Sequence, residues 1–224
     1  PIWLFSAAGI VIGFYVSYVT KNWWIGFSNI VCVLLLWVYS TTFKKKILSG
    51  NIIISLLTAW VVLIIFFFID HLSSNSLEAW QISTPLNEEA HRRIMRLAFL
   101  YGGFAFVISI IREVIKDMED MEGDARFGCR TMPIVWGVPV AKVFTGVWLM
   151  ALTGALVAIQ IYAVYLGWWW SVLYCVALII LPLLWITRKL YAATVAADFG
   201  YLSGAVKFVM LTGILSMIFF KLYH

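Results

Sequence analysis

Seven long segments of this chain carry almost no charge, and they constrain its fold more than any other feature. They cover residues 2–19, 25–40, 52–69, 95–111, 143–166, 169–187 and 206–222. A bilayer core of about 30 Å is crossed by about 20 helical residues, and about 17 are tolerated. Continuous apolar runs of this length predict an all-α, polytopic transmembrane helical bundle. A membrane barrel would instead need short strands of alternating polarity.

The charged residues indicate how this bundle lies in the membrane. Only 12% of the 224 residues are charged, against about 25% in soluble domains. If the loops after the second, fourth and sixth segments share one side with the N-terminus, that side holds eleven of the 16 Lys and Arg residues. The positive-inside rule places that side in the cytoplasm. We therefore expect a multi-pass protein of the cell membrane whose partner is the lipid bilayer, and the net charge of +5 indicates no nucleic-acid partner.

Six of the eleven acidic residues lie within residues 113–124, directly after the fourth apolar segment. On a helix of 3.6 residues per turn, Asp117, Asp120 and Asp124 share one face, and Glu113 joins it. Carboxylates stacked in this way repel one another and need compensation from a cation. Mg²⁺ suits such a site, because it typically takes one or two carboxylates together with substrate phosphates. The alternative is a solvated acidic helix end that only marks the membrane boundary.

The second charged feature is the basic loop after the second segment, which contains Lys44 and Lys45. Lysine runs of this kind usually anchor the topology of a membrane protein. They can also bind phosphate as point charges. If the ends of the second and fourth segments lie close together, the acids would hold a metal ion, the metal would hold a diphosphate, and lysine would contact the remaining oxygens.

Two stretches of the chain resemble motifs of one known family, the UbiA superfamily of intramembrane prenyltransferases. Residues 112–137 resemble its second aspartate-rich motif, D-x-x-D-x-x-x-D followed by Gly, Thr-x-Pro and Gly, here Asp117, Asp120, Asp124, Gly128, Thr131, Pro133 and Gly137. Residues 39–51 resemble its Tyr-Ser…Leu-Lys-Arg…Gly-Asn loop, with Tyr39, Ser40, Lys44, Gly50 and Asn51 matching, Phe43 in the Leu position and Lys45 in the Arg position.

This resemblance implies a UbiA-like bundle of nine transmembrane helices around a cavity that opens to lipid. The seven spans present here would correspond to helices three to nine of a single membrane-embedded prenyltransferase domain over residues 1–224. The family's first motif, Asn-(Asp)-x-x-Asp-x-x-x-Asp, is absent from the sequence. The chain is therefore expected to be N-terminally incomplete and inactive alone. The alternative is a degenerate, non-catalytic relative.

The resemblance also implies a reaction, the Mg²⁺-dependent transfer of a polyprenyl group, geranylgeranyl by preference, from an allylic diphosphate to a lipophilic acceptor. Asp117, Asp120 and Asp124 would bind the metal, with Glu113 as a further candidate. Lys44 would stabilise the departing diphosphate, and the ring face of Tyr39 would stabilise the allylic cation.

The remaining candidates have open alternatives. Lys45, Arg112 and Lys116 would contact the diphosphate, but Arg112 and Lys116 could equally balance the acidic charge or anchor the helix at the interface. Asp198 is a further candidate site residue, although an aspartate in such a loop is more often a cap or turn residue.

The motifs also bear on the acceptor and on two rival classes of protein. The motifs look most like the branch that prenylates geranylgeranylglyceryl phosphate in ether-lipid synthesis, and the alternative is prenylation of an aromatic ring in quinone biosynthesis. A CDP-alcohol phosphatidyltransferase would need two more aspartates downstream of Asp124, and only Asp198 follows. A cation transporter would carry acids within its spans. The second, third, fifth and sixth segments have none, which argues against it.

Overall fold

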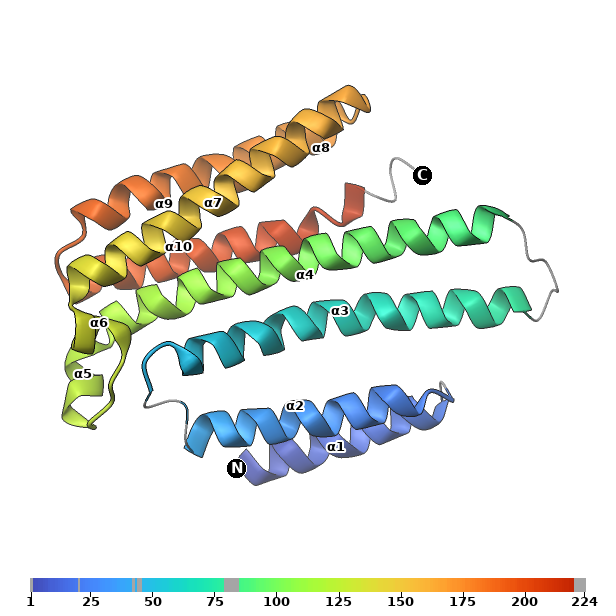
Figure 1. Cartoon of the computed structure of the whole chain (residues 1–224), viewed down its shortest axis with the longest axis horizontal. Coiled ribbons are helices and arrows are strands. Elements are labelled where there is room, and N and C mark those ends of the chain that lie inside the picture. Colours follow the sequence, from blue (N-terminus) through green and yellow to red (C-terminus); the bar gives the residue numbers. More distant parts are fainter. Residues whose placement is uncertain (1, 20, 42, 44–45, 79–84, 220–224) are drawn as a thin grey trace. The chain divides into compact units, whose positions relative to one another are not determined.

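The structure, a computed structural model, consists of helices joined by short connections (Figure 1). It describes residues 2–19, 21–41, 43, 46–78 and 85–219, but not the side chains of residues 2–5, 67–78, 85–88 and 90. The part that it describes contains no strand, which confirms the predicted all-α class. In chain order the elements are α1 (Ile2–Val19), α2 (Trp23–Thr41), α3 (Ser49–Glu78), α4 (Pro85–Glu119), α5 (Met121–Arg126), α6 (Met132–Trp136), α7 (Val138–Tyr165), α8 (Trp169–Cys175), the π-helix η2 (Val176–Ile180), α9 (Leu181–Ala192) and α10 (Ala196–Leu215).

Six helical stretches of the described residues are long and apolar enough to cross a membrane. They are Trp23–Thr41, Ser49–Phe66, His91–Glu119, Val138–Tyr165, Trp169–Ala192 and Ala196–Leu215. Five of them lie over the predicted spans 25–40, 52–69, 95–111, 143–166 and 169–187. The sixth overlaps the predicted span 206–222 but begins ten residues earlier, at Ala196, so the first half of this helix was wrongly expected to be a loop. The other predicted span coincides with α1, in which Ser6–Val19 forms a shorter apolar helix. The predicted polytopic helical membrane bundle is thus confirmed.

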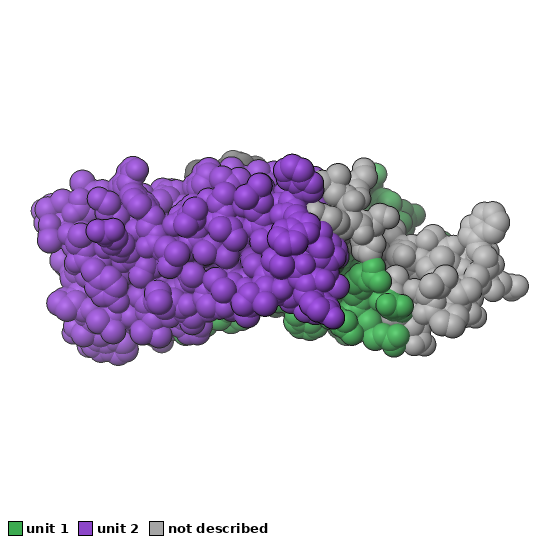
Figure 2. Space-filling model, turned by 90° about the horizontal axis from the view of Figure 1, so that it is seen from above, with its two compact units in different colours: residues 1–44, 52–106 green, residues 45–51, 107–224 purple. Residues whose placement is uncertain are grey.

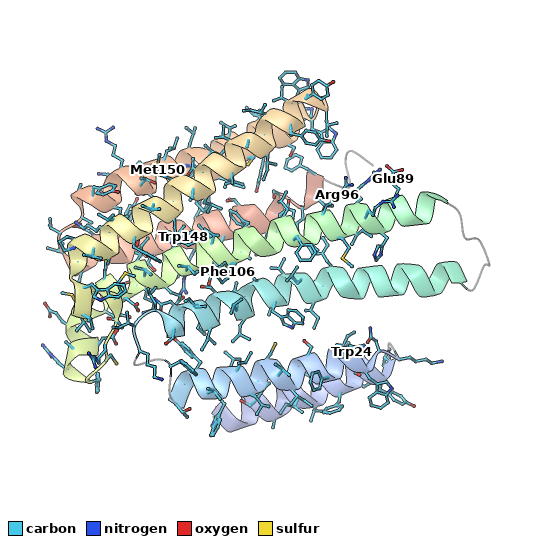
Figure 3. All side chains as sticks on the ribbon, in the orientation of Figure 1. Trp24, Glu89, Arg96, Phe106, Trp148 and Met150 are labelled. Carbon is cyan, nitrogen blue, oxygen red and sulfur yellow. The ribbon has the colours of Figure 1, made fainter. Side chains whose placement is uncertain are left out.

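Large apolar side chains cover the outer surfaces of these helices (Figure 3). Exposed examples are Trp24 on α2, Phe99 on α4, Val147 on α7 and Leu211 on α10. A soluble monomer rarely exposes so much contiguous apolar surface, because water opposes it. Lipid tails do not, so this surface fits a protein whose surroundings are hydrocarbon.

The chain divides into two compact units, coloured separately in Figure 2. Unit 1 comprises residues 1–44 and 52–106, and unit 2 comprises residues 45–51 and 107–224. Helices α3 and α4 each contribute to both units. The acidic cluster of residues 113–124 belongs to unit 2.

In unit 1, α1 and α2 pack as a hairpin whose close contacts depend on two glycines. A Cβ atom on Gly13 would lie 2.5 Å from Asn29 Cγ, and one on Gly26 would lie 3.0 Å from Ser17 Oγ. Small residues of this kind let membrane helices approach closely. At the turn, Asn22 Oδ1 accepts a 3.1 Å hydrogen bond from the backbone N–H of Trp24 and caps the start of α2.

Helices α3 and α4 also contact each other within unit 1. A Cβ atom on Gly102 would lie 3.0 Å from Leu63 Cδ2, so the absence of a side chain there makes room for leucine. The rings of Phe66 and Tyr101 stack with centroids 6.3 Å apart. Aromatic pairs at this spacing add about 0.5–1.5 kcal/mol to the stabilisation from burial alone.

The core of unit 2 forms where α4, α7, α9 and α10 turn their apolar faces to the interior. Buried side chains recur every three or four residues along each helix, which is the spacing of one helix face. The largest fully buried ones are Ile108, Ile111, Val114 and Ile115 of α4, Leu149 of α7, Leu183, Ile186 and Leu190 of α9, and Leu202, Val206 and Val209 of α10.

The predicted span 169–187 is interrupted by the π-helix η2, which lies just before Pro182. Proline has no N–H to donate, and its ring clashes with the carbonyl four residues earlier, here that of Leu178. Thr212 Oγ1 of α10 lies 3.1 Å from this carbonyl oxygen and 3.1 Å from that of Val209 in its own helix, and its one proton is shared between these two acceptors. Tyr174 Oη in turn donates to the carbonyl oxygen of Thr212 at 2.9 Å. The wider helical turn is therefore held by α10.

One end of unit 2 carries α5, α6 and the connection from α9 to α10 (Figure 1). Gly128 and Gly137 have φ angles of +69° and +85°, a conformation that other residues rarely adopt, and these glycines flank α6 on either side. Lys142 Nζ, near the start of α7, donates a hydrogen bond to the carbonyl oxygen of Ala193, where α9 ends. Two of the loops that the charge pattern assigns to one side of the membrane thus lie together within this unit.

Candidate functional site

The acidic cluster lies at the end of α4, where the helix bends. We expected residues 113–124 to lie on one helix, but α4 ends at Glu119 and Asp120 has a ψ angle of 3°. Hydrogen bonds of 2.9 Å from Asp120 N to Lys116 O and from Asp124 N to Asp120 O keep the helical spacing across the bend. Asp117 therefore lies on α4, Asp120 at the bend and Asp124 on α5.

Asp117 is half-buried, and a residue of α3 holds its side chain in place. Asn51 Nδ2 donates a 2.8 Å hydrogen bond to Asp117 Oδ2, across 66 positions of sequence. Asn51 lies in the first turn of α3 and is 9% exposed, so few other positions are open to its amide. Both residues belong to unit 2. Sequence reasoning named Asn51 only through the Gly-Asn element of the resemblance and did not identify it as a partner of Asp117.

Two cationic side chains from the same helix balance part of the acidic charge. Arg112 Nη1 pairs with Glu113 Oε1, and Lys116 Nζ pairs with Asp120 Oδ2 four residues later. The Lys116 pair is largely exposed, so its contribution to stability is small, about 0.5 kcal/mol. These pairs are the charge balance that was one alternative for Arg112 and Lys116, and the contacts of these residues with diphosphate stay predictions.

The carboxylate of Asp117 is hydrogen-bonded to the neutral amide of Asn51 and is surrounded by other acidic side chains. Glu113, Asp120 and Asp124 all lie close enough to interact with it electrostatically. The described residues nevertheless contain no group of three or more His, Cys, Asp or Glu side chains arranged to hold a metal ion by themselves. Asp117, Asp120 and Asp124 thus lie near one another without forming a complete metal cage.

This donor set fits Mg²⁺ better than a metal that needs a full protein cage. Carboxylate oxygens are the hard ligands that Mg²⁺ prefers, and one or two of them suffice when substrate phosphates and water complete the octahedron. Asp117 offers one oxygen to Asn51 and has its second oxygen for another partner. The predicted metal ligands therefore remain chemically suitable.

The residues predicted from the basic loop are Tyr39, Lys44 and Lys45. Tyr39 lies in α2 and belongs to unit 1. Lys44 and Lys45 lie outside the described residues. Their roles beside the diphosphate stay predictions.

Asp198 has the local role that sequence reasoning gave as the alternative. Its Oδ2 accepts hydrogen bonds from the backbone N–H groups of Thr194 and Val195, at 2.9 and 3.2 Å. This carboxylate caps the first turn of α10. The same turn meets the acidic end of α4, because a Cβ atom on Gly200 would lie 2.9 Å from Glu119 Oε1.

The helices and the acidic cluster place this chain in a class of proteins: multi-pass helical membrane proteins with an acidic site at the end of one span. The sequence model of the UbiA prenyltransferase family matches residues 2–220. The chain belongs to this family, as its motifs predict.

Several curated relatives are named digeranylgeranylglyceryl phosphate synthase. That of Methanosphaera stadtmanae is 30% identical over 132 residues, which is 59% of this chain and 38% of the relative. That of Methanothermobacter thermautotrophicus is 32% identical over 140 residues, 62% of this chain and 40% of the relative. That of Methanopyrus kandleri is 33% identical over 114 residues, 51% of this chain and 40% of the relative. The matched part of the chain thus spans about two fifths of each relative. No solved structure matches the chain.

Proposed function

We propose that the full-length protein transfers a geranylgeranyl group from geranylgeranyl diphosphate to geranylgeranylglyceryl phosphate, in ether-lipid synthesis. The observation that carries this proposal is the family match over residues 2–220. The shared name of the three relatives above supports the acceptor. That name gives no support to the aromatic acceptor of quinone biosynthesis.

The proposed site assigns a task to each charged group near the end of α4. Asp117 and Asp124, with Asp120, would hold Mg²⁺, which the family generally uses. Bound there, the metal would supply positive charge to the departing diphosphate. Lys116 and Arg112 would turn from their acidic partners toward phosphate oxygens, and Lys44 and Lys45 would contact the remaining ones.

The hydrocarbon surroundings would serve the other half of the reaction. Departure of diphosphate leaves an allylic fragment with carbocation character, which water would hydrolyse. Tyr39 would present its ring face to this cation, an interaction of about 0.5–2 kcal/mol. The apolar helices would exclude water and accommodate the prenyl chain. The bias of Lys and Arg toward one side supports a site at the cytoplasmic face of the cell membrane.

The test of this proposal is a transfer assay on the full-length protein in lipid nanodiscs. Labelled geranylgeranyl diphosphate is supplied with Mg²⁺ and one acceptor at a time, either geranylgeranylglyceryl phosphate, 4-hydroxybenzoate or dihydroxynaphthoate. We expect a labelled diether product from the first acceptor only. Transfer to an aromatic ring alone would replace this acceptor by the quinone alternative.

A further inference from the structure

We infer that Asn51 is a positioning residue, which orients the Asp117 carboxylate for a metal-bound diphosphate while leaving the charge of that carboxylate uncancelled. This inference rests on the proposed function of the acidic cluster. It adds a role for a neutral side chain that lies on another helix.

Asn51 is held firmly by the turn that begins α3. It lies in the first turn of α3, one residue after the buried Gly50, and is 9% exposed. The chain reaches this turn through Leu48, whose φ angle of +56° marks a sharp reversal, and Ser49 N donates to Ile47 O at 2.6 Å. The Asn51 amide therefore approaches Asp117 from a fixed backbone, at 2.8 Å.

The acids of the cluster differ in the charge of their partners. Glu113 and Asp120 each pair with a cation of α4, whereas the partner that the structure gives Asp117 is an uncharged amide. A lysine or arginine at position 51 would neutralise Asp117 and compete with a metal ion for it. An amide donor fixes one carboxylate oxygen and leaves the negative charge in place.

The start of α3 also carries an electrostatic field of its own. Asn51 belongs to the N-terminal turn of α3, where the helix dipole and unpaired N–H groups are positive. This end lies beside Asp117, since the side chains touch. This positive end and the Asn51 amide both act on the carboxylate from the side of α3. Asn51 thus orients Asp117 without bringing a net charge of its own.

Loss of the Asn51 amide should lower the affinity of the site for Mg²⁺, which can be measured. Removing a group that orients a metal ligand typically costs 10–100-fold in metal affinity. The experiment measures binding of labelled geranylgeranyl thiolodiphosphate, an unreactive analogue of the donor, to the full-length protein in nanodiscs at a series of Mg²⁺ concentrations. We expect Asn51→Ala to require about 10-fold more Mg²⁺ for half-maximal binding. Asn51→Gln, which retains an amide donor, should recover part of this loss.

Two further variants separate positioning from general damage. Asn29→Ala removes an asparagine from the α1–α2 hairpin of unit 1 and should leave the Mg²⁺ requirement unchanged. In an Asp117→Asn background, Asn51→Ala should change the Mg²⁺ requirement less than about twofold. Asn51 acts through the carboxylate of Asp117, and that carboxylate is absent from this background. If Asn51→Ala does not fold, Asn51→Gln alone must still raise the requirement above that of the wild type.

The outcomes distinguish this inference from the proposed function. A wild-type Mg²⁺ requirement that neither Asn51 variant changes overturns the positioning role and leaves the proposed reaction standing. Equal effects of Asn51→Ala in the presence and absence of Asp117 overturn it as well. Mg²⁺-dependent binding with the expected loss, but without transfer to any acceptor, supports the positioning role and contradicts the reaction. Wild-type binding that is independent of Mg²⁺ contradicts both.

Discussion

Thr212 Oγ1 of α10 lies 3.1 Å from the carbonyl oxygen of Leu178, the carbonyl that Pro182 cannot bond as an ordinary helical residue would. This contact joins two spans at the π-helix η2. It places a side-chain donor at the point where the backbone lacks one.

Thr212→Val tests the energetic value of this contact. Valine preserves the shape but removes the donor, so we expect a loss of about 0.5–1.5 kcal/mol in the free energy of unfolding, measured by SDS denaturation in mixed micelles. Thr153→Val is the matched control, because the buried Thr153 hydroxyl donates to Leu149 O of its own helix and the described residues give it no acceptor on another helix, so its removal should cost much less. Equal costs for the two variants would contradict the role of Thr212.

Gly13→Ala tests the close approach of α1 and α2. The new methyl group would lie 2.5 Å from Asn29 Cγ and 2.9 Å from Asn29 Cβ, so the helices must separate, at a cost of about 1–3 kcal/mol. Gly9→Ala, one turn earlier on the same helix, meets nothing within 4 Å and should be neutral or slightly stabilising. Thermal unfolding in detergent compares the two. A Gly13→Ala variant as stable as Gly9→Ala would show that the packing is looser than described.

Asp117→Asn tests the acidic site without changing its shape. The asparagine can still accept a hydrogen bond from Asn51, and the repulsion from neighbouring acids falls, so the melting temperature should hold or rise. We expect the rate of prenyl transfer to fall at least about 100-fold, which corresponds to about 2.7 kcal/mol of transition-state stabilisation. Glu122→Gln, an exposed acid of α5, is the control and should keep most of the activity. If Asp117→Asn kept a tenth of the wild-type rate, Asp117 would not be a metal ligand.

The helices were predictable because length and lack of charge decide them. Helix α4 continues past its apolar segment into the acidic residues, as their helical spacing predicts. The bend at Asp120 was not predictable, because no glycine or proline marks it. The π-helix before Pro182 was also missed. The sequence contains the proline, but only the fold brings Thr212 to the carbonyl of Leu178.

The acids of the candidate site were predictable from the sequence, but their contact with α3 was not. The spacing of Asp117, Asp120 and Asp124 identified the acids, and the pair of Lys116 with Asp120 follows from their four-residue separation on a helix. The bond between Asn51 and Asp117 spans 66 positions and depends on tertiary packing, which periodicity cannot reveal.

The most direct test of the central claim, that the acidic end of α4 binds a divalent cation for the departure of diphosphate, is metal removal from the full-length protein. Transfer of labelled geranylgeranyl groups to geranylgeranylglyceryl phosphate is followed after treatment with EDTA and again after excess Mg²⁺ is restored. We predict that EDTA abolishes transfer, that Mg²⁺ restores it in the wild type, and that the variant carrying both Asp117→Ala and Asp120→Ala stays inactive at every Mg²⁺ concentration. Transfer that continues in EDTA, or that survives in the double variant, would contradict the claim.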